Sequence, residues 1–338
     1  MGGDTQARGY RAPAPDPASF IHWPDDFGTR FTLFVDTEEE FDWRQPLRRD
    51  SRSVTAIAAM PEAHRRFAER GVGVTFLVDH PIATSPQAAE TLNRCLADGR
   101  STVGAQLHPW VNPPFDEDVN GPNSFTGNLP KSLQAAKLAE LTRAIAAAFG
   151  ARPLAYRAGR YGIGPDTFAL LRAEGYRLDS SVRPAYDYSP EQGPDFHAIP
   201  NRAYRAGGLV VLPFTTVFTG ALRGSGAGLY RALGGIPKGR GIAARLHLLS
   251  RVSLTPEDMP LADALEAVRV AEGEGLRVLN FAFHSPSVEP GHTPYVRDAA
   301  DLAAFWRWWE EVLALLDRLG VRNASLAELL EASEQSAN

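Results

Sequence analysis

Short apolar segments alternate along this chain with longer segments of helical periodicity, and this alternation limits the fold more than any other feature. A glycine or a polar corner separates most of the neighbouring segments. Strands that alternate with helices pair in parallel, because each helix carries the chain back across the sheet. The sequence therefore predicts an α/β protein with a mostly parallel sheet. The expected strands are 31–35, 72–78, 102–107, 155–157, 209–214 and 278–282, and the expected helices are 54–70, 86–98, 131–149, 165–174, 261–273, 298–319 and 325–332.

The chain is long enough for one decorated domain. It has 338 residues, of which 44% are hydrophobic, so it can bury a large core. We expect an N-terminal extension at 1–28 and a single domain at 29–330, with a long loop at 109–130 and a basic, glycine-rich insertion at 220–251. We interpret the insertion as a solvated surface segment, and the alternative is a binding site for an anionic group such as a nucleotide or phosphate.

Charge and cysteine content exclude several classes of function. The formal net charge is −5, which argues against non-specific binding to nucleic acid or anionic lipid as the main activity. The single cysteine, Cys95, excludes an intrachain disulfide and a cysteine-based zinc cluster, so a metal must be held by His, Asp or Glu. Residues 1–26 lack the pattern of a secretory signal, and no apolar run reaches spanning length. We therefore expect a cytoplasmic protein without membrane insertion.

An acidic cluster directly follows the first expected strand. Its members are Asp36, Glu38, Glu39, Glu40 and Asp42. Like charges this close repel one another, and a bound cation would relieve the repulsion. Because residues i and i+2 of an extended segment point the same way, Asp36 and Glu38 can serve one pocket, as a general base and a metal ligand. The alternative is an acidic surface loop.

Other polar residues follow three later strands. His108 comes directly after the strand 102–107, and Gln106 faces the same side. Arg157 ends another strand and can hold a carboxylate by two hydrogen bonds. His284 follows the last strand, and histidine titrates near neutral pH as a general acid should. Since the carboxyl ends of parallel strands meet at one edge, these residues are expected to share a site.

In this order, the acidic, histidine, arginine and late histidine strand ends resemble the motifs of the polysaccharide deacetylases, which are carbohydrate esterase family 4 with the NodB homology domain. The resemblance covers about residues 31–324, and the segments HPWVNPP and FHSPSVEPGHTPYVR resemble its WalW-type branch. It implies a distorted (β/α) barrel of about seven strands. It also implies a metal-dependent hydrolase that removes N-acetyl groups from a sugar-containing substrate.

The resemblance also implies roles for individual residues. Asp36 matches the catalytic base, Arg157 the residue that orients it, His284 the general acid, and Asp179 the acidic residue that supports His284. Glu38 resembles the carboxylate ligand of a divalent metal, usually zinc, with nickel or cobalt as alternatives. The residues expected to bind substrate are Trp110, Arg160, Tyr161 and His292.

The metal ligands depart from the family pattern. The family has two histidines separated by three residues, and this chain has Gln106 and Trp110 at those positions, with His108 between them. Glutamine is a poor zinc ligand. The ligands expected are Glu38, His108 and a third group, and the candidates for that group are Gln106, His80, Asn112 and Glu39.

Two other functions remain open at this stage. One is an inactive homologue that binds carbohydrate through Trp43, Trp110 and Tyr161, and the other is a hydrolase of small amides or imides. For an active deacetylase, the expected substrates are an acetylated sugar or a nucleotide-linked or lipid-linked sugar, and no nucleic acid. The tryptophans in 305–309 are interpreted as the face by which a helix packs onto the barrel, rather than as part of a subunit interface. The oligomeric state stays open.

Overall fold

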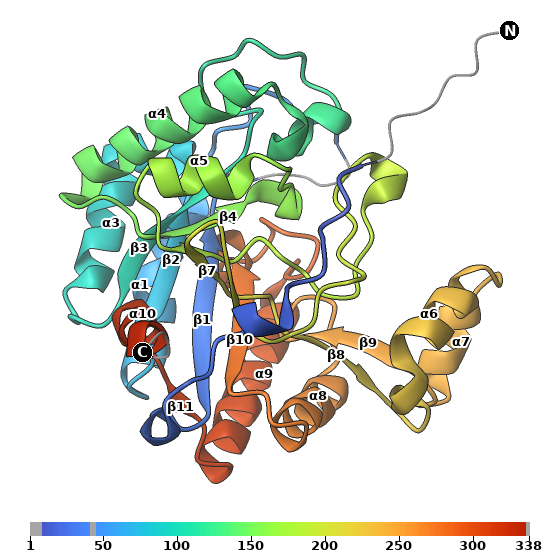
Figure 1. The fold of residues 1–338 in the computed structure, drawn as a ribbon. Coiled ribbons are helices and arrows are strands. Elements are labelled where there is room, and N and C mark those ends of the chain that lie inside the picture. Colours follow the sequence, from blue (N-terminus) through green and yellow to red (C-terminus); the bar gives the residue numbers. More distant parts are fainter. Residues whose placement is uncertain (1–8, 41–44, 336–338) are drawn as a thin grey trace, which may run out of the picture.

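The computed structural model describes residues 9–40 and 45–335, and a curled sheet lies at its centre (Figure 1). The strand order is β10-β1-β2-β3-β4-β5-β7-β6, and β11 pairs with β1. The pairs from β10 through β7 are all parallel, and only β6 joins its neighbour in the antiparallel direction. The strands are β1 (Arg30–Thr37), β2 (Val74–Val78), β3 (Thr102–Leu107), β4 (Ala155–Ala158), β5 (Leu178–Asp179), β6 (Tyr204–Ala206), β7 (Leu209–Val211), β10 (Val278–His284) and β11 (Arg322–Asn323). This arrangement confirms the predicted distorted (β/α) barrel.

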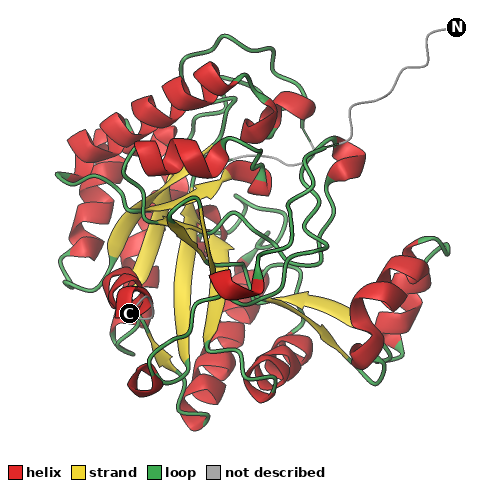
Figure 2. Ribbon diagram, in the orientation of Figure 1, coloured by secondary structure: helices red, strands yellow, loops and turns green. Residues whose placement is uncertain are grey.

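The helices lie around the outside of the sheet (Figure 2). They are α1 (Met60–Ala68), α2 (His80–Ala83), α3 (Pro86–Leu96), α4 (Lys131–Phe149), α5 (Thr167–Ala173), α8 (Leu261–Gly273), α9 (Ala299–Arg318) and α10 (Leu326–Gln335). The predicted helices 131–149 and 261–273 match α4 and α8 residue by residue. Within residues 9–40 and 45–335, every helix is too short or too polar to span a lipid bilayer.

Several boundaries differ from the sequence prediction for local reasons. The strand expected at 209–214 ends at Val211, and Pro213 lacks the amide hydrogen that a further strand pair would need. The helix expected from 298 begins at Ala299, because the Asp298 carboxylate caps it by accepting hydrogen bonds from the backbone N–H groups of Ala300 and Asp301. Strands of two or three residues, such as β5 and β11, are too short to produce a periodic signal.

The sheet stays open between its edge strands β10 and β6, and residues from the loops after β5, β7 and β9 form hydrogen bonds to β10. The Ala282 N–H donates to the Leu254 carbonyl at 3.2 Å. The Asn280 N–H donates to the Thr215 hydroxyl at 2.9 Å, and the Asn280 side chain donates to Ser180 Oγ at 2.9 Å. Backbone and side-chain groups of these loops thus bond to β10 in place of a further strand.

The tryptophan run on α9 packs inward. Trp308 and Trp309 are buried, and the Trp309 ring lies 5.8 Å from the rings of both Phe281 and Phe283 on β10. Phe305 meets Phe283 edge to face at 5.3 Å. These contacts fix α9 against the strand that ends in His284.

The insertion expected at 220–251 is folded. Strands β8 (Thr216–Thr219) and β9 (Ser250–Ser253) form an antiparallel ribbon. Helices α6 (Gly226–Gly234) and α7 (Gly239–Arg245) come between these two strands in the sequence. We call residues 220–249 the helical arm. Figure 1 shows it projecting from the barrel at the end of the ribbon.

A buried lysine fixes the start of the loop 109–130. Lys137 on α4 is fully buried, and its Nζ donates to the carbonyls of Pro109, Asn112 and Pro114 at 3.0, 2.7 and 2.6 Å. It also pairs with Glu117 at 3.0 Å. The loop therefore leaves β3 in one defined direction, directly after His108.

Lys137→Met is expected to lower the free energy of unfolding by about 3 kcal/mol, because it leaves buried carbonyls and a carboxylate without their donor. Urea denaturation measures this loss. Lys131→Met on the same helix is the control: its ion pair with Asp166 is exposed, so its loss costs less than about 1 kcal/mol. Equal effects of the two changes would contradict the role given to Lys137.

Candidate active site

The carboxyl ends of β1, β3, β4 and β10 surround a cavity of about 170 Å³. Asp36 lies directly opposite His284 in the register of β1 and β10, and Gln106 lies opposite Arg157 in that of β3 and β4. The cavity is lined by Asp36, Glu38, Gln106, His108, Arg157, Ala158, Arg160, Tyr161, Tyr188, His284 and Tyr295. The strand ends singled out in the sequence thus meet in one place.

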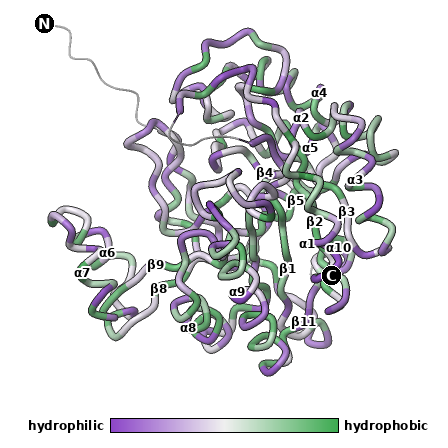
Figure 3. Tube along the Cα trace, turned by 180° about the vertical axis from the view of Figure 1, so that it is seen from behind, coloured by the Kyte–Doolittle hydropathy of each residue, from purple (hydrophilic) through white to green (hydrophobic). Residues whose placement is uncertain are grey.

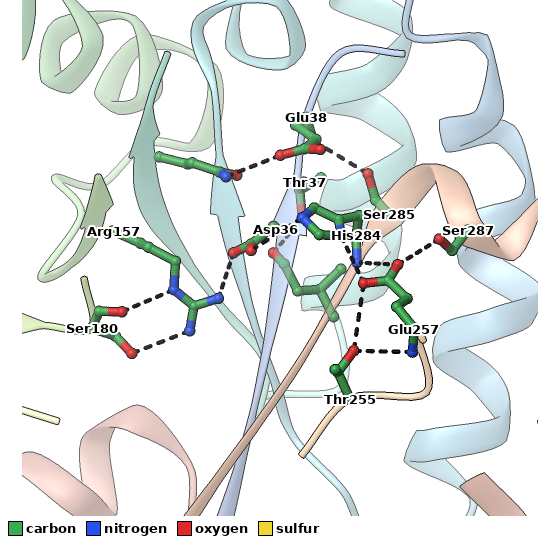
Figure 4. A network of polar contacts seen from close by, with 12 residues as sticks. Asp36, Thr37, Glu38, Arg157, Ser180, Thr255, Glu257, His284, Ser285 and Ser287 are labelled. Atoms are coloured by element: carbon green, nitrogen blue, oxygen red, sulfur yellow. Dashed lines mark hydrogen bonds and ion pairs between the residues drawn. The ribbon is translucent and has the colours of Figure 1, made fainter. Parts of the chain in front are cut away.

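Asp36 is held by Arg157. The Arg157 Nη1 donates to Asp36 Oδ1 at 2.7 Å, and both side chains are almost fully buried. Arg157 is itself fixed, since its Nε and Nη2 donate to the carbonyl and hydroxyl of Ser180 at 3.0 and 3.1 Å (Figure 4). The second Asp36 oxygen, Oδ2, lies 3.9 Å from His284 Nε2, and both residues line the cavity.

Glu257 is the carboxylate that meets His284. The His284 Nδ1 lies 2.6 Å from Glu257 Oε2, and the His284 N–H donates to Glu257 Oε1 at 3.0 Å (Figure 4). The expected partner, Asp179, instead accepts hydrogen bonds from the N–H and hydroxyl of Ser181 at 3.0 and 2.6 Å. Glu257 lies in the loop between β9 and α8, where no periodicity in the sequence connects it with β10.

The carboxylates around His284 favour its protonated form. Burial by itself lowers the pKa of His284, but Glu257, Glu38 and Asp36 outweigh burial and raise this pKa to about 10. The hydrogen bond to Glu257 through Nδ1 leaves Nε2 on the side of Asp36. The imidazolium is therefore oriented with Nδ1 toward Glu257 and Nε2 toward Asp36, and both His284 and Asp36 line the cavity.

Glu38, Gln106 and His108 form a second group in the same cavity. The Gln106 Nε2 lies 3.0 Å from Glu38 Oε2 and 3.3 Å from His108 Nε2, and His108 Nε2 lies 3.5 Å from Glu38 Oε2. Burial raises the pKa of Glu38 to about 8, although His284 and His108 oppose the shift. This carboxylate is thus poorly compensated by the protein alone.

His108 is supported from behind by Glu39 and Trp110. The His108 Nδ1 lies 2.8 Å from Glu39 Oε2, and the Trp110 Nε1 donates to Glu39 Oε1 at 2.9 Å. The two rings stack with centroids 4.4 Å apart. Trp110 is buried behind His108 and is not among the cavity-lining residues, so it positions His108 instead of contacting substrate as expected.

The carboxyl group of Asp79 completes this support. Burial raises the pKa of Glu39 to about 7 and the pKa of Asp79 well above its usual range, and a side-chain hydrogen bond links the two groups. Glu39, Asp79 and His108 also bring their ligand atoms within 4.8 Å of one another. We assign this group to the orientation of His108, since Glu39 already occupies Nδ1.

The other candidates for a third metal ligand point elsewhere. His80 lies 3.1 Å from Arg52 Nη2 and 3.4 Å from Glu140. The Asn112 side chain donates to the carbonyls of Pro113 and Lys137. Gln106 therefore remains as the third group beside Glu38 and His108.

A divalent cation fits Glu38, His108 and Gln106. The Gln106 Oε1 is buried without a hydrogen-bond partner. The oxygen and nitrogen of an amide are assigned from the hydrogen-bond network, and half a turn of this amide places Oε1 beside Glu38 and His108. A carboxylate, an imidazole and an amide oxygen then face one point, and all three are accepted metal donors.

Two of the four expected substrate-binding residues line the cavity. Arg160 and Tyr161 both do so, with φ values of 53° and 58°, a left-handed backbone that costs about 1–3 kcal/mol for each residue. His292 instead lies 3.4 Å from Glu40. Tyr188 and Tyr295, which the sequence did not single out, line the cavity as well. Asp42 and Trp43 lie outside the described residues.

An arginine lines an adjoining cavity of about 170 Å³, which shares Asp36, Tyr161, His284 and Tyr295 with the first. The Arg183 guanidinium lies 3.8 Å from the ring centroid of Tyr186 and donates to the hydroxyls of Tyr188 and Ser253 at 3.2 Å each. Among the described residues it forms no ion pair. Its positive charge is thus not neutralised by a carboxylate in contact with it.

Glu257→Gln is expected to lower the pKa of His284 by at least about one unit, because it removes the negative charge in contact with the imidazolium. Titration of His284 by NMR measures the shift, and in a pH–activity profile the alkaline limit would move to lower pH. Asp179→Asn is the matched control and leaves the pKa of His284 unchanged. A shift in the control but not in Glu257→Gln would restore Asp179 as the supporting residue.

No family model matches the sequence, and no curated protein sequence matches it. Solved structures match the fold of this chain. Two proteins provisionally assigned as polysaccharide deacetylases, from Mycobacterium smegmatis and Pseudomonas aeruginosa, align with TM-scores of 0.54 and 0.51 at 18% and 16% identity. The alignments cover 95% and 96% of this chain, and 96% and 95% of theirs. The allantoinase PuuE aligns with a TM-score of 0.52 at 15% identity, over 98% of this chain and 97% of its own. At these identities the similarity shows a shared fold.

Proposed function

We propose that this protein is a metal-dependent hydrolase that removes N-acetyl groups from a sugar-containing substrate. The observation that carries the proposal is the meeting of three groups in one cavity: the Asp36–Arg157 pair, the Glu38–Gln106–His108 group and the His284–Glu257 pair. Amide hydrolysis needs a base, an electrophile and an acid together, because amines leave poorly. The fold shared with proteins assigned as polysaccharide deacetylases supports this reaction, and the WalW-type branch is part of the proposal.

Glu38, His108 and Gln106 would hold the divalent cation, which when bound supplies a Lewis acid for the acetamide carbonyl. We propose zinc, with nickel or cobalt as alternatives. Glu39 and Trp110 keep the His108 Nε2 turned toward Glu38. The supporting residues thus hold the ligand in place before a metal arrives.

Proton transfer is assigned to Asp36 and His284. Asp36 accepts the proton of the attacking water through Oδ2, since Arg157 occupies Oδ1. His284 then donates its Nε2 proton to the leaving amine, and Glu257 keeps the ring protonated and oriented until that step. The base and the acid are separated by 3.9 Å, so both reach the same reacting amide.

Arg183 favours a substrate with a negative charge. Its guanidinium lines the adjoining cavity, where it lacks a carboxylate partner among the described residues. A carboxylate or phosphate next to the acetylated sugar would meet this charge, as in a nucleotide-linked or lipid-linked sugar. We therefore propose an acetylated sugar of this kind as the substrate.

Two observations keep alternative functions in view. Gln106 stands where the resemblance expects a histidine, which favours a carbohydrate-binding protein without catalysis. The fold shared with PuuE allantoinase and the small cavity favour a hydrolase of small amides or imides. An activity assay separates these two alternatives, because only the amide hydrolase would turn over a substrate.

Acetate release tests the proposal with N-acetylglucosamine oligomers and nucleotide-linked acetylated sugars. Small cyclic amides release no acetate, so their hydrolysis is followed by chromatography of the ring-opened acid. Asp36→Asn is expected to lower kcat/KM at least about 100-fold, because it removes the general base. Asp25→Asn, at an exposed position, is the control and leaves activity unchanged. Turnover of cyclic amides alone would favour the amide hydrolase, and no turnover of any substrate would favour the binding protein.

Gln106→His is expected to raise the affinity for zinc at least about tenfold, because imidazole is a better zinc ligand than an amide oxygen. Competition with a chromophoric chelator measures the affinity without substrate. Gln87→His, at an exposed position on α3, is the control. An unchanged affinity in Gln106→His would show that Gln106 does not adjoin the metal.

A further inference from the structure

The helical arm exposes apolar side chains that the rest of the protein leaves uncovered. Five of the eight exposed large hydrophobic side chains among the described residues lie within these 30 residues: Leu222, Ile236, Ile242, Leu246 and Leu248. Leu246 is 62% exposed and Ile236 is 56% exposed. Exposed apolar residues gathered in one segment mark an interaction surface more often than single ones do.

The arm is also strongly basic. It contains Arg223, Arg231, Lys238, Arg240 and Arg245, and the sequence has no aspartate or glutamate between Phe196 and Pro256. The chain as a whole has a formal net charge of −5, so the positive charge of the arm is opposite in sign to the net charge of the protein. Figure 3 shows hydrophobic and hydrophilic residues close together on the arm, where it projects away from the sheet.

The arm has almost no core of its own. Its buried residues are Gly226, Gly239, Ala243 and Leu249, while every arginine and the lysine of the arm are exposed. The five exposed leucine and isoleucine side chains therefore remain in water together with the positive charges. A surface that is both aliphatic and cationic matches one kind of partner, in which acyl chains lie beneath negatively charged headgroups.

We propose that the helical arm docks the protein onto the surface of an anionic phospholipid membrane. The aliphatic side chains contact the boundary between headgroups and acyl chains, and the arginines and lysine meet the lipid phosphates. The protein thereby lies on the bilayer without spanning it. A symmetric contact with a second copy is disfavoured, because it would place the positive charges of two arms against each other.

The base of the arm adjoins the cavities. Arg251 on β9 lies 3.4 Å from the ring centroid of Tyr186, and Arg183 lies 3.8 Å from the same ring. Tyr186 and Arg183 both line the second cavity. Docking through the arm therefore brings this cavity close to the membrane, where a lipid-linked acetylated sugar would be presented. That last step rests on the proposed function, whereas the docking does not.

Co-sedimentation of the full-length protein with vesicles tests the docking. We expect binding to vesicles of equal parts phosphatidylcholine and phosphatidylglycerol, and little binding to phosphatidylcholine alone. The variants Arg231→Glu/Arg245→Glu and Ile242→Ser/Leu246→Ser are each expected to lose at least about tenfold in affinity. All four positions are exposed, so the barrel is expected to remain folded.

Matched controls change the same residue types away from the arm. Arg269→Glu/Arg318→Glu and Leu154→Ser/Leu319→Ser, also at exposed positions, are expected to bind as the unchanged protein does. The proposal is overturned by absent binding to anionic vesicles, by equal binding to both vesicle types, or by control variants that lose as much affinity as arm variants. Self-association that only the arm variants abolish, without vesicle binding, would assign the arm to a second copy. No substrate is present, so failure of hydrolysis leaves these outcomes unchanged.

Discussion

The site depends on three buried carboxyl groups at the carboxyl end of β1 and directly after it. Asp36, Glu38 and Glu39 are at most 4% exposed, and buried carboxylates are costly unless positive charges or hydrogen-bond donors meet them. Each neighbouring strand supplies part of the compensation: β4 supplies Arg157 for Asp36, and the segment after β3 supplies His108 and Trp110 for Glu39. Glu38 receives the Gln106 amide and has the charges of His284 and His108 nearby, yet burial still raises its pKa to about 8, and this uncompensated charge supports the proposal of a bound cation.

Local alternation explains which parts of this site the sequence could predict. Residues two apart on a strand face one side, so Asp36 with Glu38, and Gln106 with His108, were expected in one pocket, and the cavity brings them together. Glu257 could not be predicted, because it comes from an irregular loop beyond the helical arm and only the fold brings it to His284. Asp179 shows the converse limit. Only the resemblance suggested Asp179 as the partner of His284, and in the structure Asp179 accepts its hydrogen bonds from Ser181, two residues later.

The helical arm shows that the net charge of a whole chain can hide a segment of the opposite charge. A net charge of −5 argued against an anionic surface as a partner, and the insertion was interpreted as solvated. Its composition alone is consistent with that interpretation, since basic and glycine-rich segments are usually surface loops. Folding adds the decisive fact, because α7 and the turns around the two short helices leave five leucine and isoleucine side chains exposed in the same segment as the positive charges. Charge and apolar exposure therefore have to be considered segment by segment.

The central claim is that Glu38, Gln106 and His108 form a metal site beside the Asp36 base. Elemental analysis of protein purified without chelator tests it most directly, together with Glu38→Ala, His108→Ala and the exposed control Glu90→Ala. The account predicts nearly one divalent ion per chain in the unchanged protein and the control, and loss of this ion in the other two variants. An unchanged protein that stays free of metal after incubation with excess zinc, nickel or cobalt would contradict it.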